Sequence, residues 1–187
     1  AVDDALAFIE QHALFTRTGR DGVRQVEVRG LVAAAFVHRD SRAGDPDLHS
    51  HIAVANKVQT VEDGRWLSID GRVLHKAAVT ASEVYNTALE RHLAASLGLR
   101  FAARAGQDPG KNPVREVVGV NQELTDRWSS RRRSIEARQQ ELATQFQQHR
   151  GRPPTPAEAI ALAQQATLET RQGKHSPRSL AEQRATW

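Results

Sequence analysis

Two β-prone segments separated by a loop place the strongest constraint on the fold of this chain. Residues 31–38 (LVAAAFVH) are largely apolar, and residues 49–58 (HSHIAVANKV) alternate between two faces, as strands do. Between them, residues 39–48 (RDSRAGDPDL) contain the turn formers Gly, Pro, Asp and Ser. We expect two strands joined by this loop. If they pair antiparallel, the end of the first lies beside the start of the second.

The rest of the first part of the chain predicts helices and short strands. Apolar residues at helical spacing predict a helix at residues 1–14 that has no capping side chain before it. Thr80 and Glu83 form a capping-box pattern, which predicts a helix that begins there and stops at Gly98. Short strands are expected at residues 23–28, 65–69, 99–104 and 115–120.

The last third of the sequence predicts helices only. Asn121 can cap a helix that runs to about residue 149, with a break near Ser129. A second helix starts at Thr155, and a third has a capping box at Ser179. The sequence therefore predicts an α+β fold: residues 1–120 form an antiparallel sheet with flanking helices, and residues 121–187 form a basic, all-helical extension.

Composition narrows the class of protein. The chain has no cysteine, which excludes disulfides, thiol chemistry and a zinc ribbon. No apolar run approaches the ~20 residues that span a bilayer, so we expect a soluble, cytosolic protein. Residues 1–98 carry 11 Lys and Arg against 13 Asp and Glu, a net charge of −2, whereas residues 99–187 carry 15 against 9, a net of +6. A basic half favours a partner with phosphate groups.

Three of the eight histidines have an interpretable spacing. His49 and His51 are two residues apart on an expected strand, so both point from one face with Cα atoms about 6.6 Å apart. His38 ends the preceding strand. Three imidazoles suit a transition metal such as Zn, Mn, Co or Ni better than Ca, and such a metal can act as a Lewis acid. Two histidines at this spacing are, however, more often surface residues than ligands, and the remaining five have no such partners.

Residues 30–101 resemble the core of the TrwC-type (MobF) conjugative relaxases, which belong to the histidine-hydrophobe-histidine nuclease superfamily. The resemblance rests on FVHRDSR, DPDLHSHIAVAN, the segment DGRW and EVYNTALERHLAASLGLRF, in that order. WSSRRRSIEARQQEL and TPAEAIALAQQATLETR are similar to the helical region that follows the relaxase core. At the hydrophobic position of the superfamily motif this chain has Ser50.

The resemblance implies a metal-dependent enzyme of DNA transfer. His38, His49 and His51 would hold one divalent cation (Mg, Mn, Zn, Co or Ni) that polarises a phosphate of single-stranded DNA at a plasmid transfer origin. A tyrosine attacks that phosphate and forms a reversible covalent 5′-phosphotyrosine. Residues 1–120 would then be a partial relaxase core that carries this metal site.

One departure from the family concerns the nucleophile. The family's tyrosines lie near the N-terminus of the protein, whereas the only tyrosine here is Tyr85, inside an expected helix. We therefore expect a fragment that holds no catalytic nucleophile, binds metal and does not cleave DNA. Two alternatives remain: a non-catalytic single-stranded DNA-binding module, and a metal-dependent hydrolase that uses activated water.

Further candidates surround the histidines. Asp45 or Asp47 would support a ligand imidazole through a hydrogen bond, although Asp and Gly also build turns unaided. Basic side chains that could bind phosphate include Lys57, which strand alternation places on the same face as His49 and His51. The candidate DNA contacts are Arg39, Ser41, Arg42, Lys57, Lys76, Arg131 and Arg132. An uncovered strand edge would also favour a homodimer.

Overall fold

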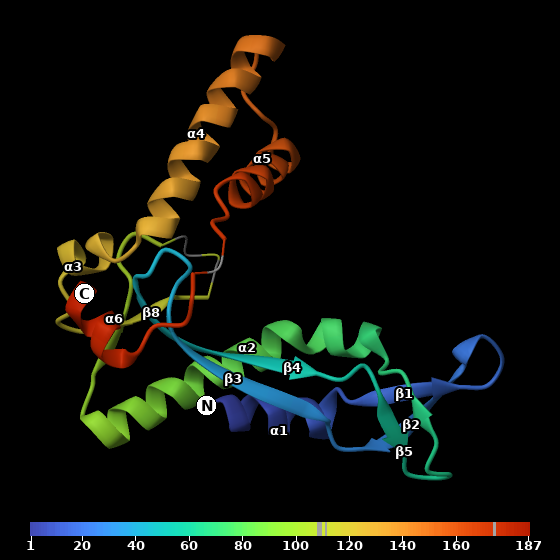
Figure 1. Cartoon of the computed structure of the whole chain (residues 1–187). Helices are drawn as coiled ribbons and strands as arrows, with labels where there is room; N and C mark the ends of the chain where they lie inside the picture. Colours follow the sequence, from blue (N-terminus) through green and yellow to red (C-terminus); the bar gives the residue numbers. More distant parts are fainter. Residues whose placement is uncertain (108–109, 111, 174) are drawn as a thin grey trace. The chain divides into compact units, whose positions relative to one another are not determined.

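The computed structural model describes residues 1–107, 110, 112–173 and 175–187 and has the expected α+β composition (Figure 1). Its strands are β1 (Phe15–Thr18), β2 (Arg24–Arg29), β3 (Ala33–Asp40), β4 (Pro46–Val54), β5 (Val58–Thr60), β6 (Trp66–Leu67), β7 (Phe101–Ala103) and β8 (Arg115–Val117). Its α-helices are α1 (Val2–His12), α2 (Gly71–Leu97), α3 (Gln122–Arg127), α4 (Ser130–Arg150), α5 (Pro156–Glu169) and α6 (Leu180–Thr186).

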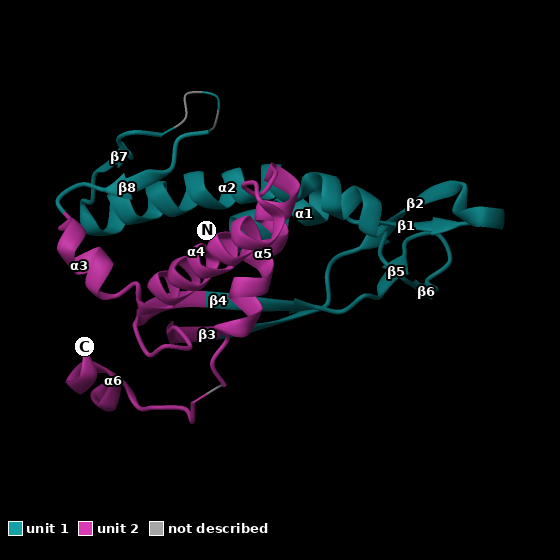
Figure 2. Ribbon diagram, turned by 90° about the horizontal axis from the view of Figure 1, so that it is seen from above, with its two compact units in different colours: residues 1–36, 50–119 teal, residues 37–49, 120–187 magenta. Residues whose placement is uncertain are grey.

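The described chain divides into two compact units (Figure 2). Unit 1 comprises residues 1–36 and 50–119, and unit 2 comprises residues 37–49 and 120–187. The strands pair antiparallel in a sheet of order β1-β2-β5-β6 and in the β7–β8 pair. β3 and β4 form a separate two-stranded sheet and run in opposite directions (Figure 1). The division between units therefore crosses this hairpin.

The sheet β1-β2-β5-β6 contains the largest fully buried side chains among the described residues. Val58 is 0% exposed, and Thr16 and Thr60 are 1% and 2% exposed. The Thr16 hydroxyl donates a hydrogen bond to the carbonyl of Ser68 at 2.6 Å. Burial of these side chains requires that their polar atoms be paired, and this pairing fixes β1 against the chain that leads into α2.

Helix α2 has its N-cap at Asp70, ten residues before the N-cap that the sequence predicts at Thr80. The predicted capping box at Thr80 is therefore wrong. The buried carboxylate of Asp70 accepts hydrogen bonds from Arg17 Nε at 2.6 Å and from the backbone N–H of Arg72 at 3.2 Å. The hydrogen bond from Arg17 keeps the pKa of Asp70 below its ordinary value. Because Asp70 caps the helix, Thr80 lies in its interior. The stop at Gly98 is confirmed, with φ at +67°.

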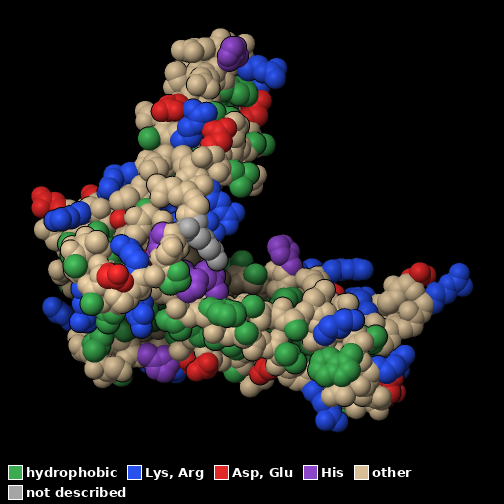
Figure 3. All heavy atoms as spheres, in the orientation of Figure 1, with side chains coloured by type: hydrophobic (Ala, Val, Ile, Leu, Met, Phe, Trp, Pro, Cys, Tyr) green, Lys and Arg blue, Asp and Glu red, His purple; other side chains and the backbone are tan. Residues whose placement is uncertain are grey.

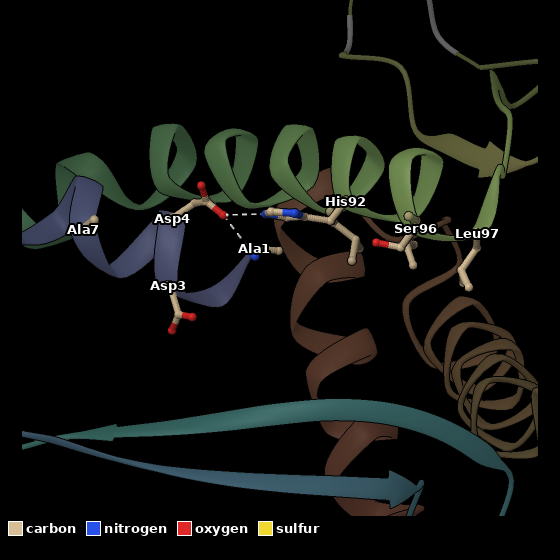
Figure 4. Close-up of a pocket in the computed structure, with 9 residues that line it drawn as sticks. Ala1, Asp3, Asp4, Ala7, His92, Ser96 and Leu97 are labelled. Carbon is tan, nitrogen blue, oxygen red and sulfur yellow. Dashed lines mark hydrogen bonds and ion pairs between the residues drawn. The ribbon is translucent and has the colours of Figure 1, made fainter.

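Helices α1 and α2 pack against each other and enclose a shallow groove (Figure 4). Figure 4 shows Asp4 of α1 directed toward His92 of α2, and the carboxylate lies 3.0 Å from His92 Nε2 and 3.0 Å from Arg91 Nη2. The hydrogen bond from His92, with that from the N-terminal amine, holds the pKa of Asp4 far below its usual range. These contacts join the two helices of unit 1.

The helices of unit 2 confirm the predicted caps. Asn121 accepts a hydrogen bond from the N–H of Glu123 at the start of α3. Complete capping boxes begin α5 at Thr155 and α6 at Ser179. Gly151, with φ at +66°, ends α4. Among the helices that the structure describes, none has both the length and the apolar character needed to cross a membrane.

Candidate metal centre

The three predicted histidines come together on the β3–β4 hairpin. His38 lies on β3, and His49 and His51 lie on β4, where alternation directs both to one face. The expected ten-residue loop is shorter in the structure, because β3 continues to Asp40 and β4 begins at Pro46. His38 therefore lies within the strand instead of at its end.

The geometry of the triad suits one small cation. The rings of His38 and His49 are 5.3 Å apart and meet edge to face at 81°. One nitrogen of each of the three histidines lies within 4.8 Å of the others. Metal–nitrogen bonds of about 2.1 Å place tetrahedral ligand atoms about 3.4 Å apart, so small side-chain rotations bring these atoms to bonding positions. His49 is half-buried, whereas His38 and His51 are exposed, so the site is open to solvent and to a substrate.

A hydrogen bond sets the tautomer of His49. Its Nδ1 lies 2.8 Å from the backbone carbonyl of Asp47 and 3.5 Å from the Asp47 carboxylate. A carbonyl oxygen only accepts, so Nδ1 is the donor in this contact and Nε2 is the nitrogen that would bind a metal. Asp47 thus orients a candidate ligand through its main chain, as the outer partners of metal-bound histidines do.

Five residues, 41–45, form the tip of the hairpin. The Ser41 N–H donates to the Asp45 carbonyl at 2.9 Å, and the Gly44 N–H donates to the Ser41 carbonyl at 3.0 Å. The Ser41 hydroxyl accepts from the N–H groups of Ala43 and Asp45. This candidate DNA contact is therefore engaged in shaping the turn.

Asp45 connects the tip to helix α4. Both of its carboxylate oxygens are engaged by Ser130, one by the N–H at 3.0 Å and the other by the hydroxyl at 2.8 Å. Ser129, at the N-cap position of α4, makes no side-chain cap bond of its own. Asp45 thus caps a helix that begins 85 residues later, a role that differs from the expected support of an imidazole.

The remaining DNA candidates lie on several elements. Arg39 is exposed on β3, and Arg42 donates to the carbonyl of Gln172 at 3.2 Å. Lys57 lies beyond the end of β4, so the strand-alternation argument that placed it with His49 is wrong. Lys76 is exposed on α2.

Two of the basic residues lie in the first turn of α4. Arg131 lines a groove with Asp45 and Trp128, and Arg132 pairs with Glu136 at 2.7 Å. In the region of α4 and α5, basic and acidic side chains lie close together (Figure 3); the arginines belong to α4, and α5 has no Lys or Arg. One of these pairs, Arg138 with Glu169 at 2.6 Å, joins the two helices. Part of the basic charge of this region is therefore neutralised internally.

Two residues that support the hairpin, Asp40 and Arg178, were missed by sequence reasoning. Asp40, two residues after His38 on the same strand face, has a side chain that is 12% exposed and pairs with Arg178 at 2.9 Å. Burial alone would raise the pKa of Asp40, but hydrogen bonds from Arg178 and Gln183 and the nearby His175 lower it. The two-residue period could have identified Asp40. No local pattern identifies Arg178, because it lies 138 residues away in the sequence.

An α+β fold with three histidines on one hairpin defines a candidate metal centre, and comparison with known proteins shows the family of the chain. The TrwC relaxase family model matches residues 1–187. The chain is 32% identical over 139 residues to the multifunctional conjugation protein TraI of Escherichia coli, covering 72% of this chain and 8% of TraI. The chain belongs to the TrwC relaxase family.

Solved structures of TrwC have a similar fold. A complex of TrwC with a 27-mer DNA that contains the recognition hairpin and the cleavage site is 26% identical, with a TM-score of 0.69, and covers 99% of this chain and 61% of that chain. A metal-bound complex of the conjugative relaxase TrwC with oriT DNA is 22% identical, with a TM-score of 0.71, and covers 99% and 59%. The chain thus spans about three fifths of these relatives and a small part of TraI.

Proposed function

We propose that this chain is the metal-binding part of a conjugative relaxase, which nicks and rejoins single-stranded DNA at a plasmid transfer origin in the bacterial cytoplasm. The observation that carries the proposal is the convergence of His38, His49 and His51 on one hairpin of a TrwC-family chain. The similar TrwC complexes with DNA support the class of substrate.

The reaction places clear demands on the site. A tyrosine hydroxyl gives up its proton and its oxygen forms a bond to phosphorus, the bond from phosphorus to the 3′ oxygen breaks, and that oxygen takes up a proton. A divalent cation held by the triad would stabilise the negative charge on the phosphate oxygens. His49, fixed by Asp47, sets the direction of one ligand, and the exposed side of the triad leaves room for the phosphate. Imidazole ligands favour Zn, Mn, Co or Ni over Ca.

The proposed DNA path rests on the basic side chains of the hairpin, of α2 and of α4. We propose that Arg39 and Arg42 at the hairpin, with Lys57 and Lys76, contact phosphates near the metal. Arg131 and Arg132 at the start of α4 would then hold the strand further along, because α4 is attached to the tip through Asp45. In this scheme residues 1–120 supply the metal site and residues 121–187 supply the basic helical extension.

Tyr85 is not the proposed nucleophile. It lies in the interior of α2 and is half-buried, in a helix that its backbone hydrogen bonds hold rigid. The 187-residue chain should therefore bind metal and single-stranded DNA without cleaving the DNA. A non-catalytic DNA-binding module is the second candidate function, and the single helical tyrosine is the observation that favours it.

Calorimetric titration with Mn²⁺ and Zn²⁺ tests the metal centre. We expect one site in the chain and at least a 100-fold loss of affinity in the His49→Ala/His51→Ala variant. The matched control is His75→Ala/His149→Ala, which removes two exposed histidines outside the triad and should retain full affinity. A folded His49→Ala/His51→Ala variant with unchanged affinity would contradict the proposal.

Incubation with end-labelled single-stranded DNA and Mn²⁺ distinguishes the candidate reactions. We expect binding and no product. A covalent protein–DNA adduct that disappears in Tyr85→Phe would show that Tyr85 is the nucleophile. Cleavage without an adduct would instead favour the hydrolase that uses activated water.

Exposed apolar side chains on the hairpin support a homodimer as well. Val37 is 65% exposed and Leu48 is 77% exposed, and a second copy would remove such surface from water. Light scattering should then give about twice the 20.7 kDa of one chain. A concentration-independent monomer would contradict this part of the proposal.

A further inference from the structure

The tip of the metal hairpin is held by a distant segment of unit 2. We define the C-terminal strap as residues 172, 173 and 175–187. Arg178 Nη2 donates to the Asp40 carboxylate at 2.9 Å and to the Gly44 carbonyl at 3.3 Å. Trp187 Nε1 donates to the same carbonyl at 2.9 Å. The strap therefore binds both the end of β3 and the middle of the tip.

These contacts are enclosed and closely fitted. The Asp40 side chain is 12% exposed and that of Arg178 is 26% exposed. Gly44 has φ at +85°, and a Cβ added there would lie 3.1 Å from Arg178 Nη2. Only glycine accommodates both this backbone conformation and the close approach of the guanidinium. Charge-assisted bonds in such a setting are stronger than exposed ones.

Packing offers the hairpin little alternative support. Along β3 and β4 each position is exposed or intermediate in burial, and none of these described positions is buried. The spacing of His38 and His49 must therefore depend on how the hairpin is held by polar contacts. Asp40 is two residues from His38 on the same face of β3, so a displacement of Asp40 moves His38 with it.

We propose that the C-terminal strap positions the metal ligands, with Arg178 as its principal positioning residue. The proposal rests on the proposed function, because it assumes that the triad binds metal. Arg178 bridges Asp40 and Gly44, and so fixes the distance between the end of β3 and the turn that leads to β4. Trp187 restrains the same carbonyl from the end of α6. Together they preorganise His38 and His49 for one cation.

Metal affinity in strap variants of the whole chain tests this inference. The variants are Arg178→Ala, Arg178→Lys and Trp187→Phe. The matched control is Arg184→Ala, which makes the same change of charge at an exposed position of α6. Partners that orient metal ligands change affinity by about 10- to 100-fold when removed. We expect Arg178→Ala to weaken Mn²⁺ and Co²⁺ binding by roughly tenfold or more, Trp187→Phe by a smaller factor, and Arg184→Ala by less than twofold.

Two further readouts separate positioning from general destabilisation. The absorption spectrum of bound Co²⁺ reports ligand geometry, and it should change in Arg178→Ala while the far-ultraviolet circular dichroism remains that of the wild type. Hydrogen exchange at the amides of Ser41 and Gly44, measured without metal, should accelerate in the same variant. Arg178→Lys keeps the charge but not the planar fork, so it should restore affinity only in part.

The possible outcomes distinguish the two proposals. A folded Arg178→Ala chain with wild-type affinity and an unchanged Co²⁺ spectrum overturns the strap and leaves the metal centre standing. A wild-type chain that binds neither ion overturns the metal centre, and the strap proposal falls with it. If Arg178→Ala does not fold, Trp187→Phe decides the question: a folded variant with unaltered affinity and spectrum overturns the strap.

Discussion

The two sheets that precede α2 are stabilised in different ways. In β1-β2-β5-β6, Val58 and Thr60 are 0% and 2% exposed, so the sheet surrounds a small core. In the β3–β4 hairpin, Val37 and Leu48 are 65% and 77% exposed, and directed polar contacts hold the tip. Burial is non-directional and tolerates small shifts, whereas hydrogen bonds fix particular atoms. The hairpin that carries the candidate metal ligands is thus the one that depends on directed contacts.

Metal binding should give the largest difference between the two sheets, in the hydrogen-exchange rates of their amides. At free Mn²⁺ about a thousandfold above Kd, binding stabilises the bound state by about 4 kcal/mol. We therefore expect hydrogen exchange of β4 amides to slow by up to about 1000-fold, with β1 and β2 amides nearly unchanged, and a chelator to reverse the effect. Equal slowing in both sheets would show that they open together and would contradict the comparison.

Truncation of one valine in each sheet should give the next largest difference, in the free energy of unfolding that each variant loses. Val58→Ala removes two buried methyl groups and leaves a cavity, which should lower the free energy of unfolding by about 2 to 3 kcal/mol. Val37→Ala makes the same change at an exposed position and should alter it by less than about 0.5 kcal/mol. Urea denaturation of the metal-free chains measures both values. Similar losses in the two variants would mean that the hairpin is packed after all.

The sequence predicted the features that depend on near neighbours. The capping boxes at Thr155 and Ser179 and the helix stop at Gly98 involve residues within one turn, and all three are present. The three histidines could also be predicted to lie together, because strand alternation relates His49 to His51 and a short hairpin brings His38 to them.

Features that depend on distant partners could not be predicted in this way. The start of α2 at Asp70 depends on Arg17, which is 53 residues away. The cap that Asp45 provides for α4 spans 85 residues, and the bond from Trp187 to Gly44 spans 143. Contacts between such distant residues leave no regular spacing in the sequence. The polar contacts that support the metal hairpin therefore become visible only in the structure.

Loss of the cap that Asp45 provides should cost less free energy than the Val58→Ala substitution. Asp45→Ala removes the acceptor of the Ser130 N–H, and capping residues contribute about 1 kcal/mol. We therefore expect the first turn of α4 to lose about 1 kcal/mol of stability, which hydrogen exchange at its first amides would measure. Asp47→Ala removes an exposed carboxylate on the same hairpin and should leave these amides unchanged. An Asp45→Ala chain with wild-type exchange in α4 would show that the tip and the helix are not coupled.

The smallest effect is expected at a polar contact between neighbouring residues near the surface, the capping box of α5, where the Glu158 side chain is 34% exposed. Hydrogen bonds from Arg152, and from the N–H and hydroxyl of Thr155, lower the pKa of Glu158 from its ordinary 4.5 to about 2. The stabilisation of α5 is therefore complete above pH 4.5 and is lost as the pH falls toward 2. Carboxyl chemical shifts measured by NMR should show this titration, and Thr155→Ala should raise the pKa. A wild-type Glu158 that titrates near 4.5 would mean that the box does not persist in solution. Because the box joins only neighbouring residues and solvent partly screens it, even its complete loss should leave the tip of the metal hairpin and its ligands in place, whereas Arg178 contacts the tip directly.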